Sequence, residues 1–358
     1  MSLTPMSATE VIARLADFDT VIDARSEDEY ALDHLPGAVN WPTLNNAERI
    51  DIGTLYKQVN PFEARKRGAS IAARNIAAHI DREVMDKPKE WKPLAYCWRG
   101  GQRSGSLSLI LSQIGFRVTL LEGGYKAFRA AVVQDIARLV KMMTFQVICG
   151  PTGSGKTRLL QALSAQGAQV MDLEALANHR SSVLGAMPGL AQPTQKRFDT
   201  LVWNQLRRFD PAKPVFIESE SKKVGNLAVP VTLMDAMRSS PCLNLQLSDD
   251  ERVALLMEDY AYLMQDVDYF CDRLSALIEL KGRAVVTSWQ NQAHKGEFGP
   301  VVLDLLQNHY DPAYLQSIQR NFAQFGDAQH LEATDRSMAA MAQLAKQLMD
   351  STRSSGTA

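Results

Sequence analysis

The sequence predicts an α/β protein in two domains, each built on a parallel sheet with flanking helices, with a helical extension in the second. Three observations lead to this expectation: a length of 358 residues, short apolar segments that alternate with segments of helical periodicity, and two glycine-rich turns that each follow an apolar segment. Strands that alternate with helices favour parallel sheets, because helices make the crossovers. This length suits two domains, which we place at residues 1–140 and 141–358.

The first domain contains three predicted strands, at residues 20–24, 93–96 and 117–121. Residues 104–114 carry leucine and isoleucine at helical spacing, so a helix is predicted between the second and third of these strands. Residues 61–84 are predicted to form a long helix with a basic outer face.

The second domain begins with a predicted strand at 145–149, followed by the second glycine-rich turn and a helix. Residues 169–172 and 215–218 repeat a pattern in which an apolar strand ends in an acidic residue. The domain boundary is expected near 141–144. Residues 351–358 are small and polar, so this tail is predicted to be disordered.

Composition limits the classes of function. Hydrophobic residues make up 46% and charged residues 22%, which is typical of globular proteins. The net charge of −1 gives no global basic field, so a nucleic acid would need a local basic patch. No leader segment and no run of 18 apolar residues is found, so no membrane span is expected. The cysteines lack a C-x-x-C pair, so we expect free thiols and a cytoplasmic protein.

The first glycine-rich turn follows a cysteine, Cys97, at the end of the strand at 93–96. Backbone amides converge at such a position and favour an anion. Arg99 and Arg103 add positive charge, so we expect the nucleophilic thiolate form of Cys97. The three residues are therefore candidates for covalent chemistry on a chalcogen or phosphorus atom. The alternative is a buried cysteine with only a structural role.

This region resembles the rhodanese domain family over about residues 5–135. The resemblance is carried by Asp23-Ala24-Arg25, by the HLPGAVN segment at 34–40, and by the LEGGY segment at 121–125. Five residues separate Cys97 from Arg103, whereas many single-domain rhodaneses have four. The longer spacing also occurs in related cysteine phosphatases, although Tyr96 stands where a histidine would favour a phosphatase.

The second glycine-rich turn, GPTGSGKT at 150–157, has the Walker A pattern between a strand and a helix. Its amides are expected to wrap a diphosphate that Lys156 neutralises, while the Thr157 hydroxyl meets Mg²⁺. The pattern does not select a base, so ATP binding is left open. A chance glycine-rich turn is the alternative. The predicted phosphate-binding residues are Gly150, Gly153, Ser154, Gly155, Lys156 and Thr157.

Two acids at strand ends, Asp172 and Glu218, are candidates for holding Mg²⁺. Glu220 would share a face with Glu218 if the strand continued, so these two could act together. Either candidate could instead cap a helix or lie on the surface.

Several further segments resemble the bacterial tRNA 2-selenouridine synthases, which join a rhodanese domain to a P-loop domain. They are GTLYKQ at 53–58, NPFEA at 60–64, YCWRGG at 96–101, the Walker segment, DLEALANHR at 172–180, IESES at 217–221 and HYDP at 309–312. The resemblance implies two steps at the wobble uridine of tRNA. Geranyl diphosphate first alkylates the sulfur of 2-thiouridine, and selenophosphate then replaces the S-geranyl group with selenium. Cys97 would carry a perselenide or direct selenophosphate onto C2.

The resemblance also implies tRNA as partner, with an enzyme that makes selenophosphate as a further candidate. Trp98 beside the cysteine is a candidate for stacking on an unpaired base, and residues 255–264 could line a geranyl pocket or simply belong to the core. For the charged candidates that follow, the alternative is that they lie on solvated helix faces, loops or turns and bind nothing. The candidate tRNA or substrate contacts are Arg65, Lys66, Arg67, Arg74, His179, Arg180, Lys222 and Lys223.

Three other functions fit parts of the sequence, and one of them, a cysteine phosphatase, would hydrolyse phosphoesters without any dependence on selenium. A sulfurtransferase fused to a small-molecule kinase would turn over ATP or GTP without tRNA. A nucleotide-gated tRNA-binding protein would use its cysteine only for packing, so alkylation of Cys97 would change nothing.

Overall fold

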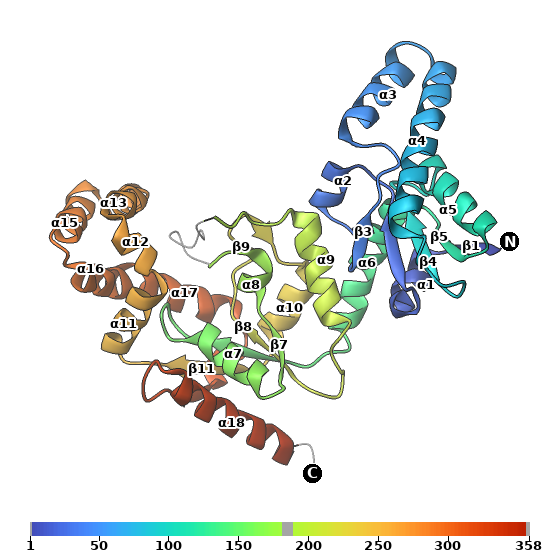
Figure 1. Cartoon of the computed structure of the whole chain (residues 1–358). Coiled ribbons are helices and arrows are strands. Elements are labelled where there is room, and N and C mark those ends of the chain that lie inside the picture. The colour runs from blue at the N-terminus through green and yellow to red at the C-terminus, as the bar shows by residue number, and fades with distance from the viewer. Residues whose placement is uncertain (1, 181–188, 356–358) are drawn as a thin grey trace. The chain divides into compact units, whose positions relative to one another are not determined.

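The computed structural model describes residues 2–180 and 189–355 (Figure 1). The chain forms two compact units, Met1–Ala137 with Pro193–Asn204 and Arg138–Gln192 with Gln205–Ala358. Each unit contains a five-stranded parallel sheet, so the predicted α/β class with parallel sheets is confirmed.

The sheet of the first unit has the strand order β1-β5-β4-β2-β3. Its central strands are the three that the sequence predicts, with β4 and β5 matching the expected bounds and β2 ending one residue earlier. The two edge strands were missed, because their short segments have no clear apolar run. The strands are β1 (Ser2–Met6), β2 (Thr20–Asp23), β3 (Ala38–Asn40), β4 (Pro93–Tyr96) and β5 (Arg117–Leu121).

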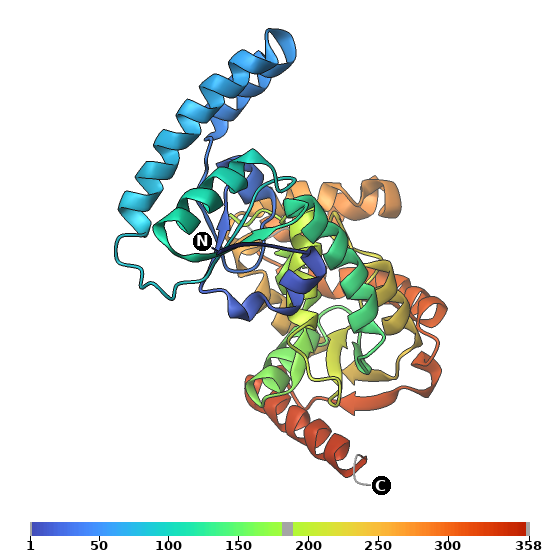
Figure 2. The ribbon, with the colours of Figure 1, turned by 90° about the vertical axis from the view of Figure 1, so that its right-hand side faces the viewer.

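The helices of this unit include a hairpin of α3 and α4 that projects beyond the sheet of its own unit (Figure 2). Asn60 caps α4 through bonds from the amides of Phe62 and Glu63, and Pro61 occupies its first turn, where no N–H is needed. The helices are α1 (Ala8–Ala13), α2 (Glu27–Leu32), α3 (Asn46–Gln58), α4 (Pro61–Glu83), α5 (Gln102–Ile114) and α6 (Gly124–Val140), with a 3₁₀ turn at Leu15–Asp17.

A helix from the later half of the chain, α9 (Gln195–Leu206), belongs to the first unit as far as Asn204. From its position in the sequence, this segment is expected in the second domain. Its contacts explain its place: the Thr200 hydroxyl donates to buried Asp33 over 2.9 Å, and Arg129 pairs with Asp199 at 2.7 Å. These partners lie far apart in sequence, so local periodicity could not reveal them.

The second unit has the sheet order β12-β11-β6-β8-β7, again parallel throughout. The bounds of β6 and β8 match the predicted strands, and β7 ends one residue before the predicted end. The strands are β6 (Phe145–Cys149), β7 (Gln169–Met171), β8 (Val215–Glu218), β11 (Cys242–Gln246) and β12 (Gln329–Glu332), and a small antiparallel pair is formed by β9 (Lys223–Val224) and β10 (Leu227–Ala228).

Helices pack against this sheet and also form a separate helical extension, as expected. The extension has its own apolar core, which includes Phe270, Leu274, Trp289 and Leu305. The helices near the sheet are α7 (Lys156–Ala165), α8 (Leu173–Ala177), α10 (Val231–Ser239), α17 (Asp311–Asn321) and α18 (Met338–Ser355), with a 3₁₀ turn at Phe325–Asp327. The others are α11 (Asp249–Asp259), α12 (Ala261–Gln265), α13 (Val267–Ser275), α14 (Ile278–Lys281), α15 (Arg283–His294), α16 (Phe298–Leu305) and a π-helical turn at Leu306–Tyr310.

Three expectations concern the C-terminal tail, membrane spans and the cysteines. Helix α18 continues to Ser355, so it includes the first part of the tail that was expected to be disordered, while 356–358 lie outside the described residues. Within the described ranges, no helix has both the length and the apolar character needed to cross a membrane. All four cysteines are free thiols.

We expect Trp203→Ala to lower the free energy of unfolding of the first unit by about 3–5 kcal/mol. Its indole is fully buried, packs edge-on against Phe128 and donates to Asp135 at 2.8 Å. Urea unfolding of the full chain, monitored by hydrogen exchange of the backbone amides in β2 and β4, measures this free energy. Lys196→Ala, on the exposed face of the same helix, is the control. A loss below about 1 kcal/mol would show that α9 does not stabilise this unit.

Candidate functional site

The first candidate site is the loop between β4 and α5. Cys97 at its start is 3% exposed, and its sulfur accepts a hydrogen bond from the Ser104 hydroxyl at 3.1 Å. The thiol also lies 3.8 Å from the carbonyl oxygen of Gly101. Helix α5 begins after Gly101 without a side-chain cap. Its first amides therefore remain available to an anion beside the sulfur.

A glycine turn after β5 closes against this loop. The amide of Tyr125 donates to the Cys97 carbonyl at 2.8 Å, and the amide of Lys126 donates to the Trp98 carbonyl at 3.1 Å. Gly124 has a φ of +58°, and a Cβ there would lie 2.3 Å from the Cys97 carbonyl oxygen. Only glycine allows this approach, which explains the LEGGY segment in structural terms.

A buried ion pair lies under the loop. Arg25 is 1% exposed, pairs with Asp23 at 2.6 Å, and its guanidinium stacks 4.0 Å from the centre of the Tyr125 ring. The Tyr96 hydroxyl donates to the same Asp23 carboxylate at 2.7 Å. These bonds fix the end of β4, and therefore the position of Cys97, to the end of β2.

The two arginines of the loop have different surroundings. Arg103 donates to Glu29 at 2.7 Å, so part of its charge is already balanced, whereas Arg99 is exposed. Trp98 is half-buried, lies against the Tyr125 ring at 5.4 Å, and has the Lys196 ammonium 5.7 Å from its centre. Arg99 is therefore the more accessible of the two predicted cationic groups.

The second candidate site is the Walker turn between β6 and α7. Helix α7 begins after Gly155, again without a side-chain cap, and the buried Ser154 hydroxyl has no partner within the part of the chain that the structure describes. Lys156 donates to the carbonyl of Gly150 at 2.8 Å. The amide of Gly150 donates to the Tyr314 hydroxyl at 2.6 Å. A diphosphate would find amides, a hydroxyl and an ammonium group in one place.

Arg252 on α11 holds this turn from the other side. It is 4% exposed and donates through Nε and a terminal nitrogen to the Thr152 carbonyl, at 3.0 and 2.8 Å. It also pairs with Asp311 at 2.6 Å. Asp311 belongs to the HYDP segment, so that segment helps to position the Walker turn. His309 packs edge-on against Tyr310.

Three carboxylates gather beside the Walker turn. One oxygen each of Glu174, Glu218 and Glu220 lies within 4.8 Å of the others. Glu218 is 1% exposed, and burial raises its pKa well above the usual range, with further increases from Glu174, Glu220 and Asp172. Asp172 itself caps α8 by accepting the Ala175 amide at 2.8 Å. Closely placed carboxylate oxygens of this kind fit a hard divalent cation.

These groups line one cavity of about 590 Å³, which we call the P-loop cavity. Arg180 reaches it, bonded to the Asp259 carbonyl at 2.8 Å and stacked 4.8 Å from the Tyr260 ring centre. His179 lies beside Arg180, and burial lowers its pKa. The predicted residues that line this cavity are Gly153, Ser154, Gly155, Lys156, Thr157, Asp172, His179, Arg180 and Glu218.

A second cavity, of about 550 Å³, shares Glu220 and Ser221 with the P-loop cavity. We call it the basic pocket, since Lys222, Lys223, Arg238 and Arg320 line it. The two lysines are predicted from the sequence, whereas the two arginines, which come from α10 and α17, are not.

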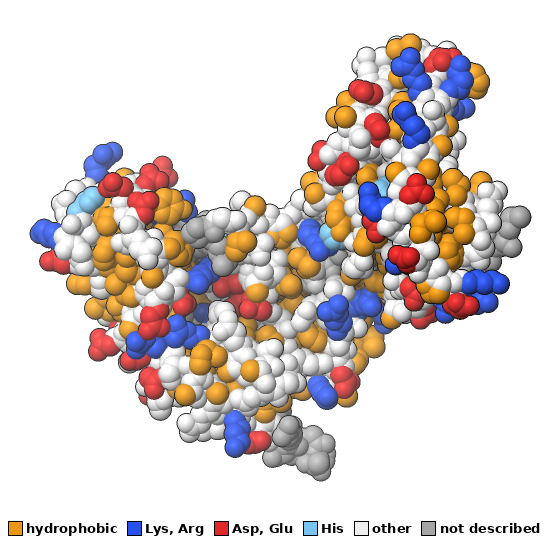
Figure 3. All heavy atoms as spheres, viewed as in Figure 1, with side chains coloured by type: hydrophobic (Ala, Val, Ile, Leu, Met, Phe, Trp, Pro, Cys, Tyr) orange, Lys and Arg blue, Asp and Glu red, His pale blue; other side chains and the backbone are white. Residues whose placement is uncertain are grey.

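The other predicted basic candidates lie in the first unit. Arg65, Lys66, Arg67 and Arg74 are all exposed on α4, and Lys66 pairs with Glu63 at 2.6 Å. The space-filling view shows basic side chains on the α3–α4 hairpin interspersed with acidic and hydrophobic ones (Figure 3). The hairpin therefore has a mixed surface, whereas the basic pocket concentrates its cations around a cavity.

Comparison with known proteins gives consistent results. The family model described as the tRNA 2-selenouridine synthase AAA domain matches residues 143–276, and the rhodanese-like domain model matches residues 7–131. A tRNA 2-selenouridine synthase of Nitrosomonas eutropha is 36% identical over 264 residues, or 72% of this chain and 67% of that protein. One of Sulfurovum sp. is 30% identical over 345 residues, or 87% of this chain and 93% of that protein.

The chain belongs to the tRNA 2-selenouridine synthase family. The family resemblance inferred from sequence motifs is therefore confirmed, as is the combination of a rhodanese-like and a P-loop-like domain. Among solved structures, a rhodanese-related protein from Thermoplasma volcanium is 18% identical and covers 35% of this chain and 89% of that chain, with a TM-score of 0.21. That TM-score is too low to add to the fold assignment.

The sequence predicts both loops, whereas Arg252, Glu174, Arg238 and Arg320 are not predicted from it as parts of the sites. Glu174 was within a recognised motif, so its acidic side chain next to Asp172 was the available signal. The arginines had no such signal, because they are isolated in sequence and reach their sites through packing between distant elements.

We expect Arg252→Gln to weaken binding of inorganic diphosphate by roughly 10-fold or more, because the Walker turn loses the group that holds Thr152. The change should also destabilise the protein by about 3–5 kcal/mol, since Asp311 is left without its cation. Calorimetric titration and urea unfolding measure the two effects.

Asp249→Asn is a matched control, because Asp249 contacts the same arginine from an exposed position. The Arg252→Lys variant should be more stable to unfolding than Arg252→Gln but should still bind diphosphate weakly. An ammonium group cannot bind the Thr152 carbonyl and Asp311 together as a guanidinium does. Normal diphosphate binding in both Arg252 variants would contradict the proposed positioning role.

Proposed function

We propose that this chain modifies the wobble uridine of tRNA in two steps. Geranyl diphosphate first alkylates the sulfur of 2-thiouridine, and selenium from selenophosphate then replaces the S-geranyl group to give 2-selenouridine. The single observation that carries this proposal is the presence of two loops that each lead into an uncapped helix, one with a buried thiol and one with a lysine and carboxylates. Membership of a family whose relatives are named tRNA 2-selenouridine synthase supports tRNA and selenium as the substrates.

In the first step, the sulfur of 2-thiouridine forms a bond to C1 of the geranyl group while the bond from C1 to the diphosphate oxygen breaks. The base loses its N3 proton and the diphosphate leaves. Lys156 and the amides of the Walker turn are suited to stabilise the charge on this leaving group. Glu174, Glu218 and Glu220 would hold Mg²⁺, whose charge would further stabilise the diphosphate.

In the second step, selenium bonds to C2 of the base and the geranyl thiolate leaves. Cys97 could either direct intact selenophosphate or carry selenium as a perselenide. Transfer directly from selenophosphate needs no oxidant. A perselenide on Cys97 would need one, because joining a thiolate to a selenide removes two electrons. We therefore propose that Cys97, Ser104 and the amides of α5 bind selenophosphate and direct its selenium toward C2, and that water takes up the phosphoryl group as phosphate.

The basic pocket is the favoured candidate for binding the tRNA backbone near the P-loop cavity. Lys222, Lys223 and Arg320 are exposed, while Arg238 is half-buried and its Nε has no partner among the described residues. Cations around a cavity suit phosphate groups. The exposed cations of α4 and the indole of Trp98 are the candidate contacts in the first unit.

We expect Cys97→Ala to reduce selenation by roughly 100-fold or more while geranylation continues, because the variant removes one of the groups that bind selenophosphate and leaves the Walker turn intact. The assay contains thiolated tRNA, geranyl diphosphate and selenophosphate, followed by digestion and mass spectrometry of the nucleosides. S-geranylated nucleoside should accumulate.

Two variants make the Cys97 experiment specific. Cys97→Ser preserves the size of the side chain and should also lose selenation, whereas Cys271→Ala removes a different buried thiol and should keep both activities. Loss of both activities in Cys97→Ala would refute the assignment of selenation to the Cys97 loop and of geranylation to the Walker turn. Turnover of ATP or phosphoesters without any tRNA product would instead favour the kinase fusion or the phosphatase.

We expect the triple variant Lys222→Ala/Lys223→Ala/Arg320→Ala to bind tRNA more weakly and with a smaller salt dependence. Each lost phosphate contact should reduce the slope of log K against log salt by roughly 0.7–0.9. Filter binding at several salt concentrations measures this slope. Lys346→Ala, exposed on α18, is the control. An unchanged slope in the triple variant, with a reduced slope for Arg65→Ala/Lys66→Ala/Arg67→Ala, would assign the contact to α4 instead.

A further inference from the structure

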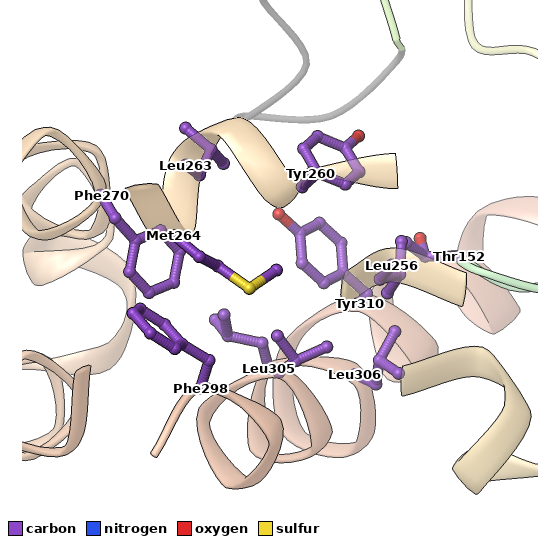
Figure 4. Close-up of a pocket in the computed structure, with 11 residues that line it drawn as sticks. Thr152, Leu256, Tyr260, Leu263, Met264, Phe270, Phe298, Leu305, Leu306 and Tyr310 are labelled. Atoms are coloured by element: carbon purple, nitrogen blue, oxygen red, sulfur yellow. The ribbon is translucent and has the colours of Figure 1, made fainter. Parts of the chain in front are cut away.

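An apolar pocket lies in the helical extension, directly beside the Walker turn. Its walls come from α11, α12, α13, α16 and the π-helical turn, and Thr152 of the Walker turn completes it. In the close-up, Thr152 and Leu256 lie at one end, Met264 projects into the middle, and the rings of Phe270 and Phe298 lie at the other end (Figure 4).

The apolar pocket and the P-loop cavity adjoin each other. Thr152, Leu256, Tyr260 and Tyr310 line both. Gly153 brings the Walker turn so close to α11 that a Cβ there would lie 3.1 Å from the Leu256 side chain. A ligand whose phosphates occupy the Walker turn can therefore extend an attached group between these residues.

The lining of the apolar pocket determines what that group can be. Among the described residues that line it, the polar side chains are Thr152, Tyr260 and Tyr310, and these lie toward the Walker turn rather than the phenylalanine pair (Figure 4). A purine and ribose would leave their polar groups without partners there, which is costly. A hydrocarbon chain would instead gain from leaving water.

The far end of the pocket is formed by an aromatic pair, and its middle by the unbranched side chain of Met264. Phe270 is buried in the core of the helical extension, and its ring centre lies 5.8 Å from that of Phe298. Met264, in contrast, is half-buried and unbranched. The pocket volume is about 50 Å³, against about 590 Å³ for the adjoining P-loop cavity. A longer chain must therefore displace a side chain, and methionine moves most easily.

We propose that this pocket holds the prenyl chain of the diphosphate substrate, that Met264 moves aside to admit it, and that Phe270 and Phe298 set the longest chain accepted. The inference rests on the proposed geranyl transfer and adds the residues that select the chain. Thr152 marks the diphosphate end of the bound chain and the phenylalanine pair marks its terminal isoprene unit.

The test compares geranyl diphosphate with farnesyl diphosphate, which is one isoprene unit longer. Phe298→Ala opens the end of the pocket while leaving the more buried Phe270 in place. We expect the ratio of kcat/KM for farnesyl to geranyl transfer to rise by roughly 10-fold or more, since even one methylene in an apolar pocket changes specificity by about that factor. Phe325→Ala, a partly buried phenylalanine of the same unit outside the pocket, is the control and should leave the ratio unchanged.

A second variant blocks the pocket instead of enlarging it. Met264→Trp should weaken calorimetric binding of geranyl diphosphate by roughly 10-fold or more, with binding of inorganic diphosphate unchanged. Equal losses of affinity for geranyl diphosphate and inorganic diphosphate would overturn the assignment, because the substitution would then act through the Walker turn and not on a bound prenyl chain. An unchanged affinity for geranyl diphosphate would also overturn it.

The outcomes separate this inference from the proposed function. If the wild-type protein transfers geranyl groups and Phe298→Ala folds but keeps the wild-type preference, the pocket assignment fails and the proposed function stands. If the wild-type protein transfers no prenyl group and binds inorganic diphosphate as tightly as geranyl diphosphate, both fail.

Discussion

Both candidate sites depend on one constraint, the convergence of backbone amides where a buried parallel strand leads into an uncapped helix. Helix α5 follows β4 through the Cys97 loop, and α7 follows β6 through the Walker turn. At α3 and α11, in contrast, the side chains of Asn45 and Ser248 accept a bond from an amide of the first turn. The amides of α5 and α7 remain available, so an anion can take the role of the cap.

This constraint is useful only if each loop is held in position. In both units an arginine that is almost fully buried performs this task, Arg25 through Asp23 and Arg252 through Asp311. Buried ion pairs add little net stability, because desolvation opposes their attraction, but removing one partner is costly. We infer that these pairs fix the geometry of the loops more than they contribute to overall stability.

The surroundings of the Walker turn are suited to a ligand that has both a charged and an apolar part. On one side lie three carboxylates, including buried Glu218 with its raised pKa, and on another side lies an apolar pocket. A polar head and an apolar tail would each find a matching surface. Such a division suits an amphiphilic diphosphate better than a nucleotide, since the polar groups of a nucleotide extend over its whole length.

The elements that depend on neighbouring residues could be predicted from the sequence alone. The strands at 93–96 and 145–149, the turns that follow them, and the two types of loop were all predicted, because apolar runs and glycine spacing act locally. Tertiary structure decided the rest. The place of α9 in the first unit, the Arg252–Asp311 pair across 59 positions, and the phenylalanine pair of the apolar pocket all join residues that are distant in the chain. No local pattern records such contacts, because they arise only when separate elements pack together and exclude water.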